Sequence, residues 1–144
     1  MFRTMDRAFE LSRDGLLLVG RLAMSAIFIP GGFSKLTHLD AFAQSLGNRG
    51  VPGGMAMAVL AAAVEFFGSL AVAIGFKTRW AALLLAVFTI VATLVSHRYW
   101  ELQDATRAMQ YAQFMKNLAI AGGFLALSIA GAGKYRIDPW TPTR

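Results

Sequence analysis

Three charged side chains fall inside long apolar stretches of this sequence. They are Arg21, Glu65 and Lys116, and Asn117 directly follows the last of them. A charge in the hydrocarbon of a membrane costs about 2.5–3.5 kcal/mol on insertion scales, so such residues usually pair with one another or serve a function. The chemistry open to them is ion pairing, proton relay, and hydrogen bonding to the polar group of a ligand.

Arg21 and Glu65 carry opposite charges and lie on apolar stretches that run in opposite directions. Counted at about 1.5 Å per helical residue from the ends of these stretches, the two positions differ in depth by only about 7 Å. An arginine side chain reaches that far along a helix. The sequence therefore predicts an intramembrane ion pair between Arg21 and Glu65. It leaves open whether the pair only orients helices or also lines a cavity for a ligand or for protons.

A second group of polar side chains lies near the ends of these stretches on the other side of the membrane. Donors and acceptors from three helices are expected to converge there, as a binding pocket requires. The candidate ligand-binding residues are Lys35, His97, Tyr111, Lys116 and Asn117. A quinone is the candidate ligand, because its two carbonyls accept hydrogen bonds and its ring packs on Phe33, Phe114 or Trp100. The alternative is that these side chains only extend to the membrane surface, which is the interpretation favoured for His38.

Other catalytic and cofactor motifs are missing from the sequence. Cysteine is absent, which excludes disulfides, thiolate ligands and C-x-x-C redox chemistry within the chain. The two histidines lie on different elements without a carboxylate cluster, so no metal or haem site is expected. No catalytic residue is identified, and whether the chain is an enzyme stays open. Any electron transfer would need a bound quinone or the redox centre of a partner protein.

The elements that position these residues are membrane-spanning helices. Of the 144 residues, 56% are hydrophobic and only 15% are charged, against about 25% charged residues in soluble domains. Four stretches supply the roughly 20 apolar residues that cross about 30 Å of hydrocarbon: residues 15–35, 54–76, 79–96 and 113–133. The prediction is a single all-α domain, an antiparallel bundle of four transmembrane helices. Residues 1–14 predict a short amphipathic helix ahead of the first span.

The connections and the basic residues predict how the bundle is oriented. Only Lys77-Thr78 separates the second and third spans, so these spans must form a tight antiparallel hairpin. Eight basic residues flank the spans on the side of the termini and four on the other side, which predicts both termini in the cytoplasm. The eight are Arg3, Arg7, Arg13, Lys77, Arg79, Lys134, Arg136 and Arg144; the four are Lys35, Arg49, Arg98 and Arg107.

The basic residues also bear on partners. The net charge is +6, but the basic residues occur in ones and twos instead of clustering, which argues against a nucleic-acid partner. They suit contacts with anionic lipid head groups. Close contacts between helices are expected at small residues: Gly122, Ala126 and Ala130 on the fourth span, and Ala58, Ala61, Ala62, Gly68 and Ala71 on the second.

Seven short stretches carry a family likeness from Leu17 to Asp138. They are Gly20-Arg21, residues 27–35 (IFIPGGFSK), Gly50-Val51-Pro52, residues 65–68 (EFFG), residues 75–79 (GFKTR), His97, and residues 114–123 (FMKNLAIAGG). In their order and spacing these stretches resemble the DoxX family of small bacterial membrane proteins. The resemblance implies a multi-pass protein of the bacterial inner membrane that is associated with redox or oxidative-stress systems.

Three functions stay open on this basis. The first is a redox-associated membrane subunit that binds a quinone or another lipophilic molecule at the polar group near the outer surface. The second is a non-catalytic scaffold that assembles with a redox partner protein or as a homo-oligomer. The third is a small transporter of protons or solutes that uses Arg21 and Glu65 as its gate.

Overall fold

Helices make up most of the chain in the computed structural model, which describes residues 2–138, with side chains from Phe9 onward. The helices are α1 (Phe2–Thr37), α2 (Leu39–Asn48), α3 (Gly54–Ile74), α4 (Thr78–Ser96) and α5 (Asp104–Ala130), with a short 3-10 helix, η1 (Tyr99–Glu101), before α5. No strand occurs in this part of the chain. Four helices, α1, α3, α4 and α5, are long and apolar enough to cross a membrane, which confirms the all-α membrane fold. The side chains of Arg3 and Arg7, and the whole of Arg144, lie outside the described residues.

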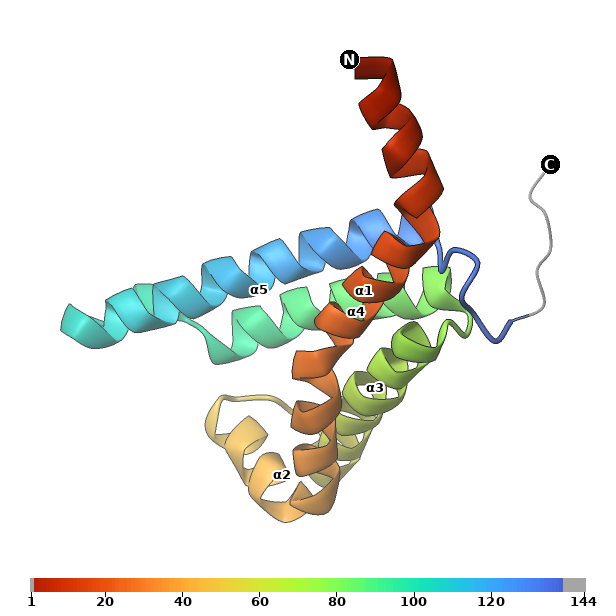
Figure 1. Cartoon of the computed structure of the whole chain (residues 1–144). Helices are drawn as coiled ribbons and strands as arrows, with labels where there is room; N and C mark the ends of the chain where they lie inside the picture. Colours follow the sequence, from red (N-terminus) through yellow and green to blue (C-terminus); the bar gives the residue numbers. More distant parts are fainter. Residues whose placement is uncertain (1, 139–144) are drawn as a thin grey trace.

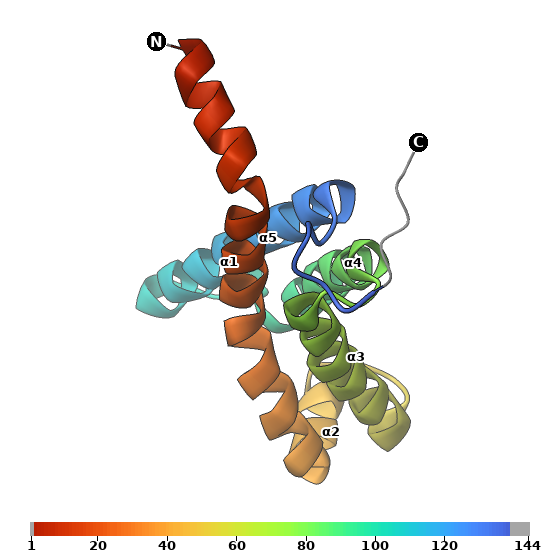
Figure 2. The ribbon, with the colours of Figure 1, turned by 45° about the vertical axis from the view of Figure 1, so that its right-hand side comes forward.

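The spans are arranged as two antiparallel pairs, α1 with α3 and α4 with α5. The tight turn between α3 and α4 joins the pairs, as the short connection at Lys77 predicts. The α4–α5 pair crosses the α1–α3 pair instead of running alongside it (Figures 1 and 2). We call the end of the molecule with the α3–α4 turn and residues 131–138 the hairpin side, and the end with α2 and η1 the loop side.

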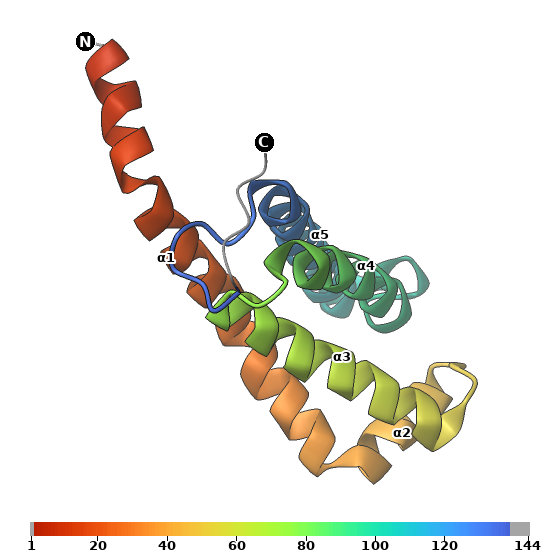
Figure 3. The ribbon, with the colours of Figure 1, turned by 90° about the vertical axis from the view of Figure 1, so that its right-hand side faces the viewer.

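The first helix is longer than the span that it contains. α1 has 36 residues, which is about 54 Å at about 1.5 Å per residue. Its first turns continue the span as one helix and protrude from the rest of the chain (Figure 3), so they are not a separate surface helix. The reason is local, because no proline interrupts the chain before Pro30 and a lone glycine at position 15 only weakens a helix.

The last helix ends earlier than its hydrophobicity suggests. α5 runs from Asp104 to Ala130, where the apolar pattern predicted residues 113–133. The φ angle is +78° at Gly131 and +73° at Gly133, a conformation that glycine adopts without steric penalty. These two glycines end the helix, and residues 131–138 turn back across the hairpin side.

The buried core lies where the two pairs cross. Phe28 of α1 meets Phe124 of α5 edge to face, with ring centroids 5.3 Å apart. Val72 of α3, Leu85 of α4 and Leu127 of α5 complete the contact. The core is therefore small, and it ties all four spans together at one level.

Small residues bring α1 and α3 close together. A Cβ added at Gly32 would lie 2.6 Å from the backbone nitrogen of Phe66, so only glycine fits there. On α3 the predicted contact residues Ala58 and Ala62 are fully buried. The predicted contact stripe on α5 is wrong, because a Cβ at Gly122 would meet nothing within 4 Å. The buried face of α5 carries Ala121, Phe124 and Leu127 instead.

Candidate functional site

The register of α1 against α3 decides which polar side chains meet. Three facing pairs define it: Arg21 with Gly75, Ser25 with Ser69, and Gly31 with Glu65. Gly31 lies at the level of Glu65, and Arg21 precedes Gly31 on α1 by ten residues. This separates Arg21 from Glu65 in depth by about 15 Å, at about 1.5 Å per residue. The prediction of an Arg21–Glu65 ion pair is therefore wrong. The prediction measured the depth of each residue from the end of its apolar stretch. In the structure the ends of the two stretches do not lie at the same level, so these depths could not be compared directly.

Arg21 instead holds the chain that follows α5. Its side chain is 1% exposed; Nη1 donates to the carbonyl oxygen of Ala132 at 2.8 Å, and Nη2 donates to that of Tyr135 at 2.5 Å. These carbonyls lie beyond the end of α5 at Gly131 and have no helical partners. The guanidinium satisfies them and fastens the segment after α5 to the first span.

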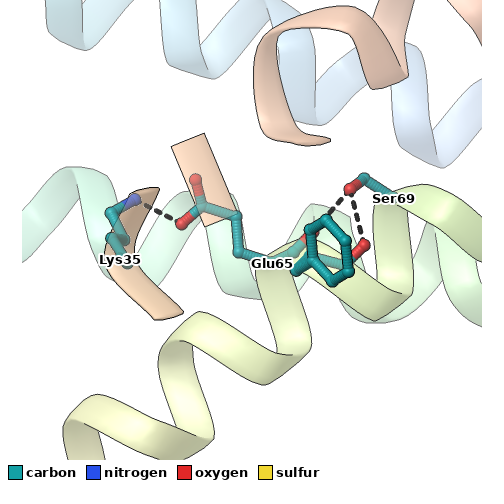
Figure 4. A network of polar contacts seen from close by, with 4 residues as sticks. Lys35, Glu65 and Ser69 are labelled. Atoms are coloured by element: carbon teal, nitrogen blue, oxygen red, sulfur yellow. Dashed lines mark hydrogen bonds and ion pairs between the residues drawn. The ribbon is translucent and has the colours of Figure 1, made fainter. Parts of the chain in front are cut away.

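Glu65 pairs with Lys35 instead. Glu65 is 5% exposed, and Lys35 Nζ donates to its Oε2. Figure 4 shows the two side chains pointing toward one another from α1 and α3. Lys35 lies one turn beyond Gly31, and its flexible side chain reaches back to the carboxylate. Ser69 Oγ donates to the backbone carbonyl oxygen of Glu65 at 2.6 Å, one turn earlier on α3.

This ion pair lines a cavity of about 190 Å³ between the two helix pairs. Lys35 and Glu65 form its wall on the α1–α3 side. The polar residues of the opposite wall are Thr89, Ser96, His97 and Asn117. Its apolar lining includes Phe28, Phe88 and Ile120. All four spans therefore contribute to one site that has a charged wall, a hydrogen-bonding wall and aromatic rings.

The structure brings together some of the residues predicted for a ligand site and separates others. Lys35, His97 and Asn117 line the cavity. Tyr111 lies outside it and packs on Tyr99, with ring centroids 5.1 Å apart. Lys116 is exposed on α5, because its neighbour Asn117 faces the cavity and successive helical residues point about 100° apart.

The aromatic lining also differs from the expectation. Phe33, Phe114 and Trp100 do not line the cavity; Phe28 and Phe88 do. Phe33 is 58% exposed and lies beside Phe66. Aromatic residues are frequent in this chain, so their presence near a span end does not show which of them face inward.

One polar contact of the site has no signal in the sequence. His97 Nδ1 lies 2.7 Å from Gln110 Oε1. An amide oxygen only accepts hydrogen bonds, so Nδ1 is the donor in this contact, and in a neutral ring Nε2 is then an acceptor. Gln110 is separated from His97 by η1 and the first turns of α5, and only their folded path brings the two side chains together.

Known proteins share most of this chain. Residues 16–98 match the DoxX family. The inner membrane protein YqjF of Escherichia coli is 39% identical over 122 residues, which cover 85% of this chain and 88% of that protein. The inner membrane protein YphA of the same organism is 34% identical over 130 residues, which cover 90% and 93%. The ER-derived vesicles protein ERV29 of Saccharomyces cerevisiae is 25% identical over 129 residues, but this is 34% of its length. No solved structure matches significantly.

Proposed function

This chain belongs to the DoxX family and is a multi-pass inner-membrane protein, and we propose that its cavity binds the ring of a quinone or a similar lipophilic molecule in a membrane redox system. The observation that supports this most directly is the position of the Lys35–Glu65 pair opposite His97 and Asn117. Charged and hydrogen-bonding groups on both walls of an apolar, aromatic cavity are what orients a ring with two carbonyl groups.

The size and the edge of the cavity fit a ring with a tail. At about 190 Å³, the cavity is smaller than the roughly 300–1,000 Å³ of a pocket that encloses a drug-sized ligand. It therefore suits one ring, with the remainder of the molecule outside. Ile27 lines the cavity and is also 51% exposed on the outer surface of α1. An isoprenoid tail would leave past this residue into the lipid.

The polar groups match the chemistry of the two redox states. Lys35 and Asn117 carry donors for the carbonyl oxygens of a quinone, and His97 Nε2 is an acceptor for the hydroxyl of a hydroquinone. Reduction of a quinone takes up two electrons and two protons. The chain has no cysteine, so in this proposal the electrons come from the redox centre of a partner protein, and the ionisable residues of the cavity exchange the protons.

A quinone titration tests the binding. We expect the protein in mild detergent to bind a short-tailed benzoquinone saturably, and Asn117→Leu to raise Kd about tenfold, because it removes one hydrogen bond but keeps an apolar side chain of similar size. Tyr111→Phe is the matched control: it also removes one polar group, but outside the cavity, and should bind as the wild type does. Absence of saturable binding, or equal weakening in both variants, would refute the site and favour a scaffold role.

We also propose that the hairpin side faces the cytoplasm, so that the cavity opens toward the outer half of the membrane. The support is the excess of basic residues on that side, among them Lys77, Arg79 and Lys134. A green fluorescent protein fused to the C-terminus should then be fluorescent in cells, because it matures in the cytoplasm. An alkaline phosphatase fusion at the same position should be inactive. The reverse pattern would contradict the orientation.

A further inference from the structure

A second and larger cavity lies on the hairpin side, away from the proposed quinone site. Its volume is about 840 Å³, within the range of a pocket that encloses a small molecule. It is formed by the α3–α4 turn, the start of α4, residues 131–138 and one turn of α1. In Figure 3 residues 131–138 pass close to the α3–α4 turn, where this cavity lies.

The lining of this cavity is strongly basic. Its basic residues are Arg13, Lys77, Arg79, Lys134 and Arg136. Its two carboxylates already accept backbone N–H groups: Asp14 Oδ1 from Lys134 at 2.9 Å, and Asp138 Oδ2 from Lys77. Among the described residues, none of the five basic side chains forms an ion pair with a carboxylate. The cavity therefore has an excess of positive charge that the described part of the chain does not neutralise.

Two buried polar atoms at the cavity have no hydrogen-bond partner within the described chain. Thr78 lines the cavity and is 4% exposed, and its Oγ1 is unsatisfied. Nη2 of Arg136 is buried and unsatisfied as well. Leaving a buried donor without a partner is unfavourable, so such atoms indicate that something else bonds to them.

The direction of α4 adds to the attraction for an anion. Thr78 is the first residue of this 19-residue helix, and the side chain of its N-cap residue, Lys77, makes no capping hydrogen bond. Free backbone N–H groups and the helix dipole make such an end favourable for a phosphate. Trp80 lines the same cavity and is 73% exposed. Tryptophan favours the membrane–water interface, which places the cavity at the depth of lipid head groups.

We propose that the hairpin-side cavity binds a phosphate group, carried by an anionic phospholipid or free in solution. Arg79 and Lys134 neutralise its charge, and the Thr78 hydroxyl and Arg136 Nη2 donate hydrogen bonds to its oxygens. The interfacial position of Trp80 favours the phospholipid as the source of the phosphate. A bound lipid would fasten the α3–α4 turn to the segment after α5.

Thermal-shift titrations of the delipidated protein in neutral detergent test the proposal and separate the two sources. We expect phosphatidylglycerol to raise the melting temperature saturably and phosphatidylcholine to leave it unchanged. A saturable rise with inorganic phosphate alone would support the same site with soluble phosphate as its ligand. No rise with either would overturn the proposal.

Variants distinguish a specific phosphate site from general attraction to a basic surface. The double variant Arg79→Gln/Lys134→Gln should raise Kd about tenfold or more, since hydrogen bonds to charged groups are the strong ones. Thr78→Val keeps every charge and should also weaken binding. Arg49→Gln/Arg107→Gln removes the same charge on the loop side and should bind as the wild type does. Equal weakening in this control, or unchanged binding by Thr78→Val, would overturn the site.

Discussion

Replacing Arg21 with methionine is expected to lower the free energy of unfolding by about 3 kcal/mol or more, because each hydrogen bond to a charged group contributes roughly 1.5–3 kcal/mol. The buried guanidinium donates to the carbonyl oxygens of Ala132 and Tyr135. Methionine replaces the aliphatic part of the arginine side chain and adds no charge, so the loss reports mainly on these two bonds and on the carbonyls left without donors. Chemical unfolding in detergent would measure it.

The same variant should change the protection of one segment in particular. Amide hydrogen exchange of residues 131–138 is expected to accelerate, because two of the hydrogen bonds that fasten this segment to α1 come from Arg21. Arg107→Met removes an exposed arginine at the start of α5 and serves as the control. If Arg21→Met lowers the free energy of unfolding no more than Arg107→Met does, and leaves the hydrogen exchange of the segment unchanged, Arg21 does not fasten this segment to α1.

Reversing one charge of the Lys35–Glu65 pair is the second large effect. Glu65→Lys is expected to lower the free energy of unfolding by about 3–5 kcal/mol, because it breaks a pair inside the membrane and places two cations together. Lys35→Glu should also lower the free energy of unfolding, but by less, because the side chain of Lys35 is partly exposed. The double variant Lys35→Glu/Glu65→Lys restores opposite charges. Its loss of unfolding free energy should be at least about 1 kcal/mol smaller than the sum of the losses in the two single variants.

A double-mutant cycle on the rejected pairing provides the comparison. Arg21→Glu combined with Glu65→Arg should show no recovery, because the two positions are about 15 Å apart in depth. Unfolding in detergent would give all the required free energies. Recovery in the Arg21 cycle and none in the Lys35 cycle would show that the register of α1 against α3 is different from the one described.

The position of the ion pair joins the two roles that the sequence left open for Glu65. Lys35 and Glu65 connect α1 to α3, as a structural pair would, and they also line the cavity, as a functional pair would. The quinone titration and the charge exchange therefore measure different properties of the same residues. A variant such as Asn117→Leu isolates the cavity, because Asn117 is not part of the pair.

The sequence by itself determined the membrane spans, the hairpin at Lys77 and the DoxX likeness. Hydrophobicity and connection length act along the chain, so a run of apolar residues shows a span without knowledge of its neighbours. The same local information indicated that Lys35, Glu65, His97 and Asn117 were unusual, since polar residues near or inside spans need a partner.

Only the tertiary structure decided which partners these residues have. One residue along a helix changes the depth of a side chain by about 1.5 Å and its direction by about 100°. The register of α1 against α3 therefore separated Arg21 from Glu65, and one step along α5 turned Asn117 into the cavity but Lys116 away from it. The partners of Arg21 depended on the end of α5 at Gly131, which frees backbone carbonyls that no pattern of side chains reveals.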